Sequence, residues 1–213
     1  MKLKVGIFAV CLLALACVFA AAPAFADSVV YNNTGPATYT TNAWSIFNYG
    51  GGEYTVTDSF TLSISEIVDG ADFYIWLYPG DLLTSVTWGL SFTPYGTPFE
   101  TGTAVGGPNT QVATAFGYYP VLEESISIPA VSMASGTYWL QLSNGLDAYD
   151  DAVWWDQSSG PSTAYETGGV GAIPSETFQI LADPTPEPPS FLLFGAGMLA
   201  LAGLLATRSK LLA

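Results

Sequence analysis

Most of the chain lacks four residue types that many protein sites depend on. Histidine is absent altogether, and the basic residues and cysteines lie only near the ends, at Lys2, Lys4, Cys11, Cys17, Arg208 and Lys210. Residues 27–183 therefore contain no Lys, Arg, His or Cys, although seventeen of the eighteen Asp and Glu residues lie there. Disulfides and side-chain ion pairs are excluded in this segment, so its carboxylates must be solvated, hydrogen-bonded or bound to a metal.

These absences exclude several classes of function. Without His or Cys, the usual zinc and copper ligands and the Ser-His-Asp and Cys-His catalytic arrangements are missing, and a Ser-Lys dyad needs a lysine. Without Lys or Arg, phosphate charge cannot be neutralised, which excludes nucleic acid as a partner. The remaining carboxylates, hydroxyls, amides and aromatic rings suit sugars and hard cations such as calcium.

An acid-pair glycosidase is the enzyme class that this composition leaves open, since it needs only two carboxylates in a cleft. Conceivable members of such a pair are Glu100, Glu123, Glu124, Asp156 and Glu166. The sequence selects no pair among them, so we expect a protein without enzymatic activity.

The N-terminus is typical of a cleavable signal peptide. Two lysines precede an apolar stretch over residues 5–22, and Ala24 and Ala26 form an A-x-A cleavage pattern. Cleavage by signal peptidase after Ala26 leaves Asp27 as the first residue. The alternative is a permanent membrane helix, which the sharp change to polar sequence after Ala26 disfavours.

The C-terminus is typical of a membrane anchor. Residues 184–190 form a proline-rich linker that can continue neither a strand nor a helix. Residues 191–206 carry no polar or charged side chain and, as a helix, would span roughly 24 Å, at the short end for a membrane crossing. The basic tail over residues 207–213, with Arg208 and Lys210, predicts a cytoplasmic end and an exported domain.

Pro186-Glu187-Pro188, followed by an apolar helix and a basic end, resembles the sorting tail of bacterial PEP-CTERM proteins. The resemblance implies recognition by an exosortase-like membrane protease, and a final location at the cell surface or in an exopolysaccharide matrix. The alternative is a plain anchor that is never cleaved. Residues 136–140, 156–164 and 175–180 also resemble segments of PEP-CTERM ectodomains, which implies a shared β-sandwich without a known activity.

Residues 27–183 read as one all-β domain. Apolar and polar residues alternate over residues 54–65, 85–92 and 137–142, and residues 73–78 are apolar on both faces, which predicts a central strand. Shorter strands are expected at 29–31, 43–49, 112–118, 124–128, 152–155 and 176–181. Roughly ten short strands punctuated by Gly and Pro favour a jelly-roll-like β-sandwich. Asp58 interrupts an apolar face, and we expect it at a bulge or an edge.

An acidic segment is the candidate metal site. Asp147, Asp150 and Asp151 lie within five residues, together with Asn144 and Gly145. Calcium takes six to eight oxygen ligands from flexible loops of this kind. The spacing does not match an EF-hand loop, so a solvated acidic loop is the alternative. No other cofactor is expected.

Trp154, Trp155 and Asp156 form the candidate carbohydrate site, because aromatic faces beside carboxylates suit sugar binding. Neighbouring strand residues point to opposite faces, so at most one of the two tryptophans is expected in the core. The alternative is that these rings fill the core. The sequence as a whole predicts an exported, non-catalytic surface or matrix protein, with a calcium- or carbohydrate-binding module as the alternative.

Overall fold

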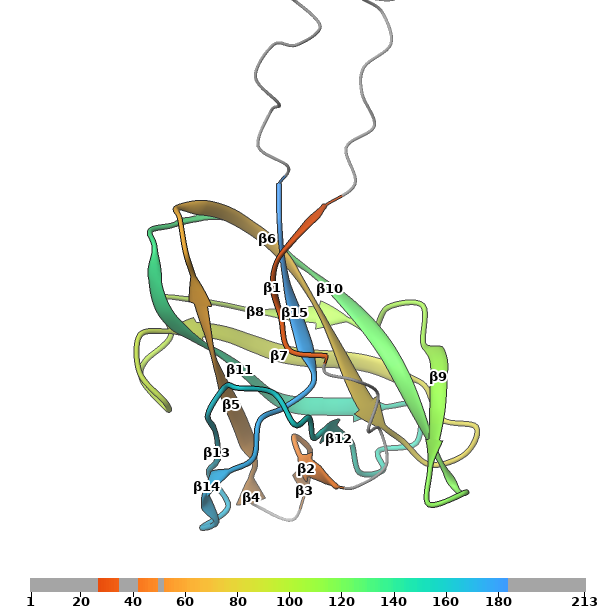
Figure 1. Ribbon diagram of the computed structural model, residues 1–213. Coiled ribbons are helices and arrows are strands. Elements are labelled where there is room, and N and C mark those ends of the chain that lie inside the picture. The colour runs from red at the N-terminus through yellow and green to blue at the C-terminus, as the bar shows by residue number, and fades with distance from the viewer. Residues whose placement is uncertain (1–26, 35–41, 50–51, 184–213) are drawn as a thin grey trace, which may run out of the picture.

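Two antiparallel sheets form most of the described domain (Figure 1). The computed structural model describes residues 27–34, 42–49 and 52–183. Within these ranges, no helix is long and apolar enough to cross a membrane. The signal peptide, the Pro186-Glu187-Pro188 motif, the apolar stretch over 191–206 and the basic tail lie outside the described residues.

The first sheet has the strand order β1-β15-β6-β10-β9, and β12 pairs both with β6 and with β2. Its strands are β1 (Ser28–Asn32), β2 (Ala43–Ser45), β6 (Glu66–Trp76), β9 (Thr110–Ala115), β10 (Tyr119–Met133), β12 (Trp154–Asp156) and β15 (Phe178–Ala182).

The second sheet has the order β14-β13-β5-β11-β7-β8. Its strands are β5 (Thr55–Leu62), β7 (Leu83–Ser91), β8 (Glu100–Val105), β11 (Gly136–Asp147), β13 (Ala164–Glu166) and β14 (Gly171–Ile173). A separate short hairpin joins β3 (Asn48–Tyr49) to β4 (Gly52–Glu53).

One hydrophobic core draws on both sheets, as expected for a β-sandwich. Phe60 on β5 contacts Phe178 on β15 edge-to-face with ring centroids 6.4 Å apart, and Tyr31 on β1 lies against both rings. With no disulfide available in residues 27–183, this apolar contact between the sheets is a main source of stability.

The first and last strands of the domain pair with each other. Ser28 at the start of β1 lies opposite Ala182 at the end of β15, so the chain enters and leaves the domain at the same place. Ala182 in turn pairs with Val68, near the start of β6. The far end of β6 at Trp76 lies eight residues on, about 26 Å away at the rise of an extended strand.

Alternation predicted three of the long strands correctly, whereas the longest, β10, was expected only over 124–128. The segments expected at 54–65, 85–92 and 137–142 correspond to β5, β7 and β11, and β6 is the central strand expected around Phe73. Ile64 and Phe92, which continue two of the apolar alternations, are exposed because their strands have already ended at Leu62 and Ser91.

The expectation for Asp58 was wrong. Asp58 lies at neither a bulge nor an edge: it faces Leu140 in unbroken register at the centre of the second sheet and is fully buried. Its carboxylate accepts hydrogen bonds from the backbone N–H of Glu176 (2.6 Å), the Ser162 hydroxyl (2.9 Å) and the backbone N–H of Ser59 (2.6 Å). Hydrogen bonding within the core therefore replaces the solvent that a charged strand residue normally needs.

Candidate metal centre

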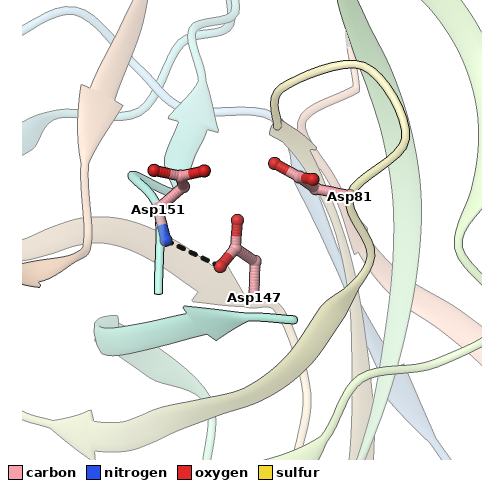
Figure 2. A group of neighbouring side chains, drawn as sticks. All are labelled: Asp81, Asp147 and Asp151. Atoms are coloured by element: carbon pink, nitrogen blue, oxygen red, sulfur yellow. Dashed lines mark hydrogen bonds between the residues drawn. The ribbon is translucent and has the colours of Figure 1, made fainter. Parts of the chain in front are cut away.

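Three aspartates from two separate loops converge at the end of the sandwich reached by β6. Asp81 lies in the turn between β6 and β7, Asp147 is the last residue of β11, and Asp151 lies in the loop before β12. Figure 2 shows Asp81 facing the other two carboxylates. One carboxylate oxygen from each residue lies within 4.8 Å of the others. The pairing of β7 with β11 brings the two loops together.

Loop hydrogen bonds hold the Asp147 side chain, and a backbone turn positions Asp81. The Asp147 Oδ1 accepts the backbone N–H groups of Tyr149 (3.0 Å) and Asp151 (2.8 Å), which folds the loop over the end of β11. The turn carrying Asp81 is closed by the Asp81 backbone N–H, which donates to the Tyr78 carbonyl at 3.1 Å. The Thr84 hydroxyl on β7 donates to the Leu146 carbonyl on β11 at 2.9 Å, which links the two strands beside the loops.

Two buried oxygens in this cluster lack a hydrogen-bond donor. Asp81 is 8 % exposed and Asp147 is 4 % exposed, yet the Oδ2 atoms of both have no hydrogen-bond partner among the described residues. Burial raises the pKa of Asp81, and the neighbouring Asp147 and Asp151 raise it further. A buried acceptor without a donor is costly, so the arrangement requires either a proton or a cation between the carboxylates.

The spacing of these oxygens suits a calcium ion. Calcium–oxygen distances are about 2.3–2.6 Å, so two ligands of one ion lie at most about 5 Å apart. Besides Asp147 Oδ1, which holds the loop, the three carboxylates provide up to five oxygens, and no Lys or Arg exists in residues 27–183 to neutralise them. Asp151 is exposed and lines an open hollow of about 470 Å³ that gives an ion and its waters access to the cluster.

The sequence predicted two of the three aspartates in this cluster. Asp147 and Asp151 belong to the cluster, but Asp150 does not: its side chain is exposed and lines the neighbouring hollow, while its backbone has a φ of 59°. Asp81 takes the third place. Pro79-Gly80-Asp81 has the composition of a turn, but its position beside Asp147 follows from strand pairing, which the sequence pattern does not reveal.

The predicted carbohydrate residues divide between two faces of β12. Trp155 is fully buried in the core and donates from Nε1 to the Thr177 carbonyl at 3.0 Å. Asp156 is also fully buried, accepting from Trp76 Nε1 at 2.6 Å and from the Thr177 hydroxyl at 2.9 Å. Neither residue can therefore contact a sugar from solvent, and this part of the expectation is corrected. Trp154 lies on the outer face and is half-buried.

Several other carboxylates are buried elsewhere in the domain. Burial raises the pKa of Asp58 to about 6, of Glu124 to about 7 and of Asp156 to about 7. The pKa of Glu176 lies well above its usual value, first because it is fully buried and then because Asp58 and Asp156 lie near it. Neither Glu176 carboxyl oxygen has a hydrogen-bond partner among the described residues. These groups lie in the interior, where they serve the fold.

Comparison with known proteins assigns no ligand to the three aspartates. No protein-family model matches the chain, and no curated protein matches its sequence.

Proposed function

We propose that this chain is an exported, non-catalytic cell-surface or matrix protein whose β-sandwich domain binds a calcium ion through Asp81, Asp147 and Asp151. The observation that carries the calcium proposal is the pair of buried Oδ2 atoms on Asp81 and Asp147, which converge on Asp151 without a donor among the described residues. A divalent cation satisfies both oxygens at once and cancels most of their mutual repulsion.

The proposed location rests on the chain ends and on the position of the site. A signal peptide over residues 1–26 directs export, and the Pro186-Glu187-Pro188 motif, the apolar helix and the tail containing Arg208 and Lys210 direct sorting by an exosortase-like protease. Both segments join the domain where β1 pairs β15. The aspartates lie beyond the opposite end of β6, so a chain held by its C-terminal helix presents the site away from the membrane.

Calcium at this location would act as a structural ligand. It would hold the loop between β11 and β12 against the turn between β6 and β7, at an end of the domain that no disulfide can reinforce. Extracellular calcium modules bind with dissociation constants of about 10⁻⁴–10⁻³ M. A protein outside the cell meets concentrations in that range, which makes occupancy there compatible with a modest affinity.

Thermal unfolding of the full chain, stripped with a chelator and then titrated with calcium, tests this proposal. A ligand that binds only the folded state stabilises it by about 2.7 kcal/mol at one hundred times its dissociation constant. Asp147→Asn keeps the Oδ1 acceptor for the loop but removes the charge, so its melting temperature should no longer respond to calcium. Asp150→Asn removes the same charge from the same loop and should respond like the unmodified protein.

Magnesium at equal ionic strength provides the control for charge screening. Because magnesium demands a small octahedral site and gives up its waters reluctantly, we expect a much smaller shift. The calcium proposal fails if calcium leaves the melting temperature unchanged, or if Asp147→Asn and Asp150→Asn respond alike.

A further inference from the structure

The outer face of the first sheet carries a second, separate cluster of aromatic residues. On β6, Ile75 faces the core and Trp76 faces outward; on β12, Trp155 faces the core and Trp154 faces outward. Trp76 and Trp154 are directly paired across the two strands. Tyr119 stacks on Trp76 with centroids 6.1 Å apart and contacts Trp154 at 5.8 Å. Tyr78 extends the cluster by contacting both Tyr119 (5.7 Å) and Trp154 (5.5 Å).

The turn between β9 and β10 adds two exposed rings at an energetic cost. Phe116 is 69 % exposed and Tyr118 is 54 % exposed. Phe116 has a φ of 50° and Gly117 a φ of 67°, so both central residues of the turn closed by Tyr118 N–H and the Ala115 carbonyl are left-handed. Asn-Gly is the favoured pair for such a turn, and a bulky residue at positive φ is an outlier. Strain of this kind clusters at functional sites.

The strained turn places the Phe116 ring against Trp76. This ring lies edge-on to Trp76 with centroids 5.6 Å apart, and Tyr118 lies edge-on to Tyr119 at 4.9 Å. Trp76 is itself held from below by its hydrogen bond to the buried Asp156. Trp76, beneath the other rings, is therefore fixed before any ligand arrives, which lowers the entropic cost of binding. We name Tyr78, Phe116, Tyr118, Tyr119 and Trp154, with Trp76 beneath them, the outer aromatic face.

A small hollow of about 150 Å³ opens in this face between Trp76, Tyr119 and Trp154. Asn42, whose side chain is exposed, and Ala43 complete its lining. Aromatic walls with a few polar groups are typical of small-ligand sites. Here the lining includes Asn42 and Tyr119, whose amide and hydroxyl can exchange hydrogen bonds with hydroxyl groups, while the rings can cover the apolar C–H face of a sugar ring.

Charge decides between the possible occupants. Residues 27–183 carry seventeen acidic and no basic side chains, so anionic polymers, anionic lipid surfaces and a second copy of this chain are all repelled. The lining of the hollow contains no carboxylate of its own. The ligand that suits this surface is uncharged and presents both hydroxyl groups and apolar C–H faces.

We propose that the outer aromatic face binds a neutral polysaccharide, with Tyr119 and Trp154 forming the walls of one sugar subsite and Phe116 and Tyr118 extending the contact along the polymer. This proposal does not rest on the calcium proposal, although Tyr78 shares its turn with Asp81 and Trp154 follows the loop of Asp151. It also differs from the site expected from sequence, because Trp155 and Asp156 support the face from within and do not contact the sugar.

Affinity electrophoresis of the full chain through native gels containing a soluble polysaccharide tests the proposal. The neutral probes are dextran, hydroxyethylcellulose and galactomannan, and the anionic comparator is polygalacturonate. We expect retardation by at least one neutral polymer and none by polygalacturonate. Trp154→Ala should weaken retardation at least tenfold. The matched control is Phe92→Ala, which removes another exposed phenylalanine (65 %) just beyond the end of β7 in the second sheet.

Phe116→Asn separates binding from folding. Asparagine suits a left-handed turn position, so this variant should melt at an equal or higher temperature than the unmodified protein while losing affinity at least fivefold. The proposal is overturned if no neutral polymer retards the protein, if Phe92→Ala weakens binding as much as Trp154→Ala, or if Phe116→Asn keeps full affinity. Sedimentation that shows a dimer abolished by Phe116→Asn would instead identify the face as a self-interface.

Discussion

Asp147 accepts the backbone N–H of Asp151 at 2.8 Å through Oδ1, while its Oδ2 points toward Asp81. One carboxylate thus shapes the loop between β11 and β12 and also contributes an oxygen to the acidic cluster. Any ligand held by Oδ2 is coupled to the conformation of that loop. The loop runs from Asp151 to Trp154 within three residues. The conformation of the acidic cluster can therefore affect the position of Trp154 in the outer aromatic face.

Asp81→Asn should stabilise the calcium-free protein. In the absence of a cation, Asp81 faces two other carboxylates with no basic residue in the domain to offset them. Asparagine removes one charge and offers an N–H donor to the Oδ2 of Asp147. We expect a gain in the free energy of unfolding of a few tenths to about 1 kcal/mol in chelator, measured by urea unfolding.

The same variant should lose most of the stabilisation that calcium gives to the unmodified protein. Asp150→Asn is again the matched control, and it should change neither quantity appreciably. A loss of stability for Asp81→Asn in chelator would contradict the repulsion that we infer between these carboxylates.

The domain should become more stable as the pH falls from 8 to about 4.5. Burial raises the pKa values of Asp58 to about 6 and of Glu124 and Asp156 to about 7, above those of the unfolded chain. The folded state therefore binds more protons than the unfolded state between about pH 4 and pH 7. Stability from these groups is fully present below the unfolded pKa values and is lost as the pH rises through the folded ones.

Glu124→Gln isolates one of these groups. Glu124 accepts the Gly107 N–H at 2.8 Å through Oε2, which glutamine can retain, and its Oε1 has no partner among the described residues. At pH 8 the variant should be more stable than the unmodified protein by about 1–3 kcal/mol, because it removes a buried charge. At pH 4 the two should converge, since a protonated glutamate is also neutral.

Glu123→Gln is the control for that measurement, because Glu123 is the next residue on β10, points to the opposite face and is half-buried. It makes the same change of charge and should alter stability little at either pH. Urea unfolding across the pH range provides the comparison. A Glu124→Gln variant that is no more stable at pH 8 than at pH 4, relative to the unmodified protein, would exclude a buried ionised Glu124.

Gly160→Ala should strongly destabilise the domain, and a second substitution should remove much of this loss. A Cβ at Gly160 would lie 1.5 Å from Oδ1 of Asn33. Asn33 cannot easily move, since its Nδ2 donates to the Ser162 hydroxyl at 2.7 Å and the Glu176 carbonyl at 2.6 Å. We expect a loss of about 1–3 kcal/mol from this overpacking.

A double-mutant cycle checks that cause. Asn33→Ala should itself destabilise by removing buried hydrogen bonds, but adding Gly160→Ala to it should then cost far less than it does alone. Ser159→Ala, at the exposed neighbouring position, should be nearly neutral. Strictly additive effects of the two substitutions would place the cost of Gly160→Ala elsewhere.

Sequence patterns predicted several of the strands, but they missed β8, β13 and β14 and did not reveal which strands pair. Alternation identified β5, β7 and β11 because one face of each is buried, and the doubly apolar run around Phe73 identified β6 as central. The order of strands within the two sheets depends on contacts between distant segments. Asp58 illustrates the limit: only the arrival of Ser162 and Glu176, more than one hundred residues later, makes its burial possible.

The candidate sites, too, could be predicted only in part from the sequence. Asp147 and Asp151 were found because they lie in one loop, whereas Asp81 comes from another loop that strand pairing brings beside them. Trp154 and Trp155 were correctly expected on opposite faces, but the pattern does not say which face is the core. Trp154 pairs with Trp76, so both point to the outer face, but the sequence does not reveal that β6 and β12 pair.

The C-terminal tail yields the last prediction, on processing by an exosortase-like enzyme. In a cell with a functional exosortase, the mature protein should lack the apolar helix over 191–206 and should end near Pro186-Glu187-Pro188, alone or joined to another molecule. Mass spectrometry of the C-terminal peptide from the native protein reports the cleavage point and any attached mass together. Replacing Pro186-Glu187-Pro188 by three alanines should leave the helix uncleaved and the protein in the membrane fraction, while folding of the domain, which ends near Ala182, stays unchanged. Retention of the helix by the unmodified protein in such cells would mark the tail as a plain membrane anchor.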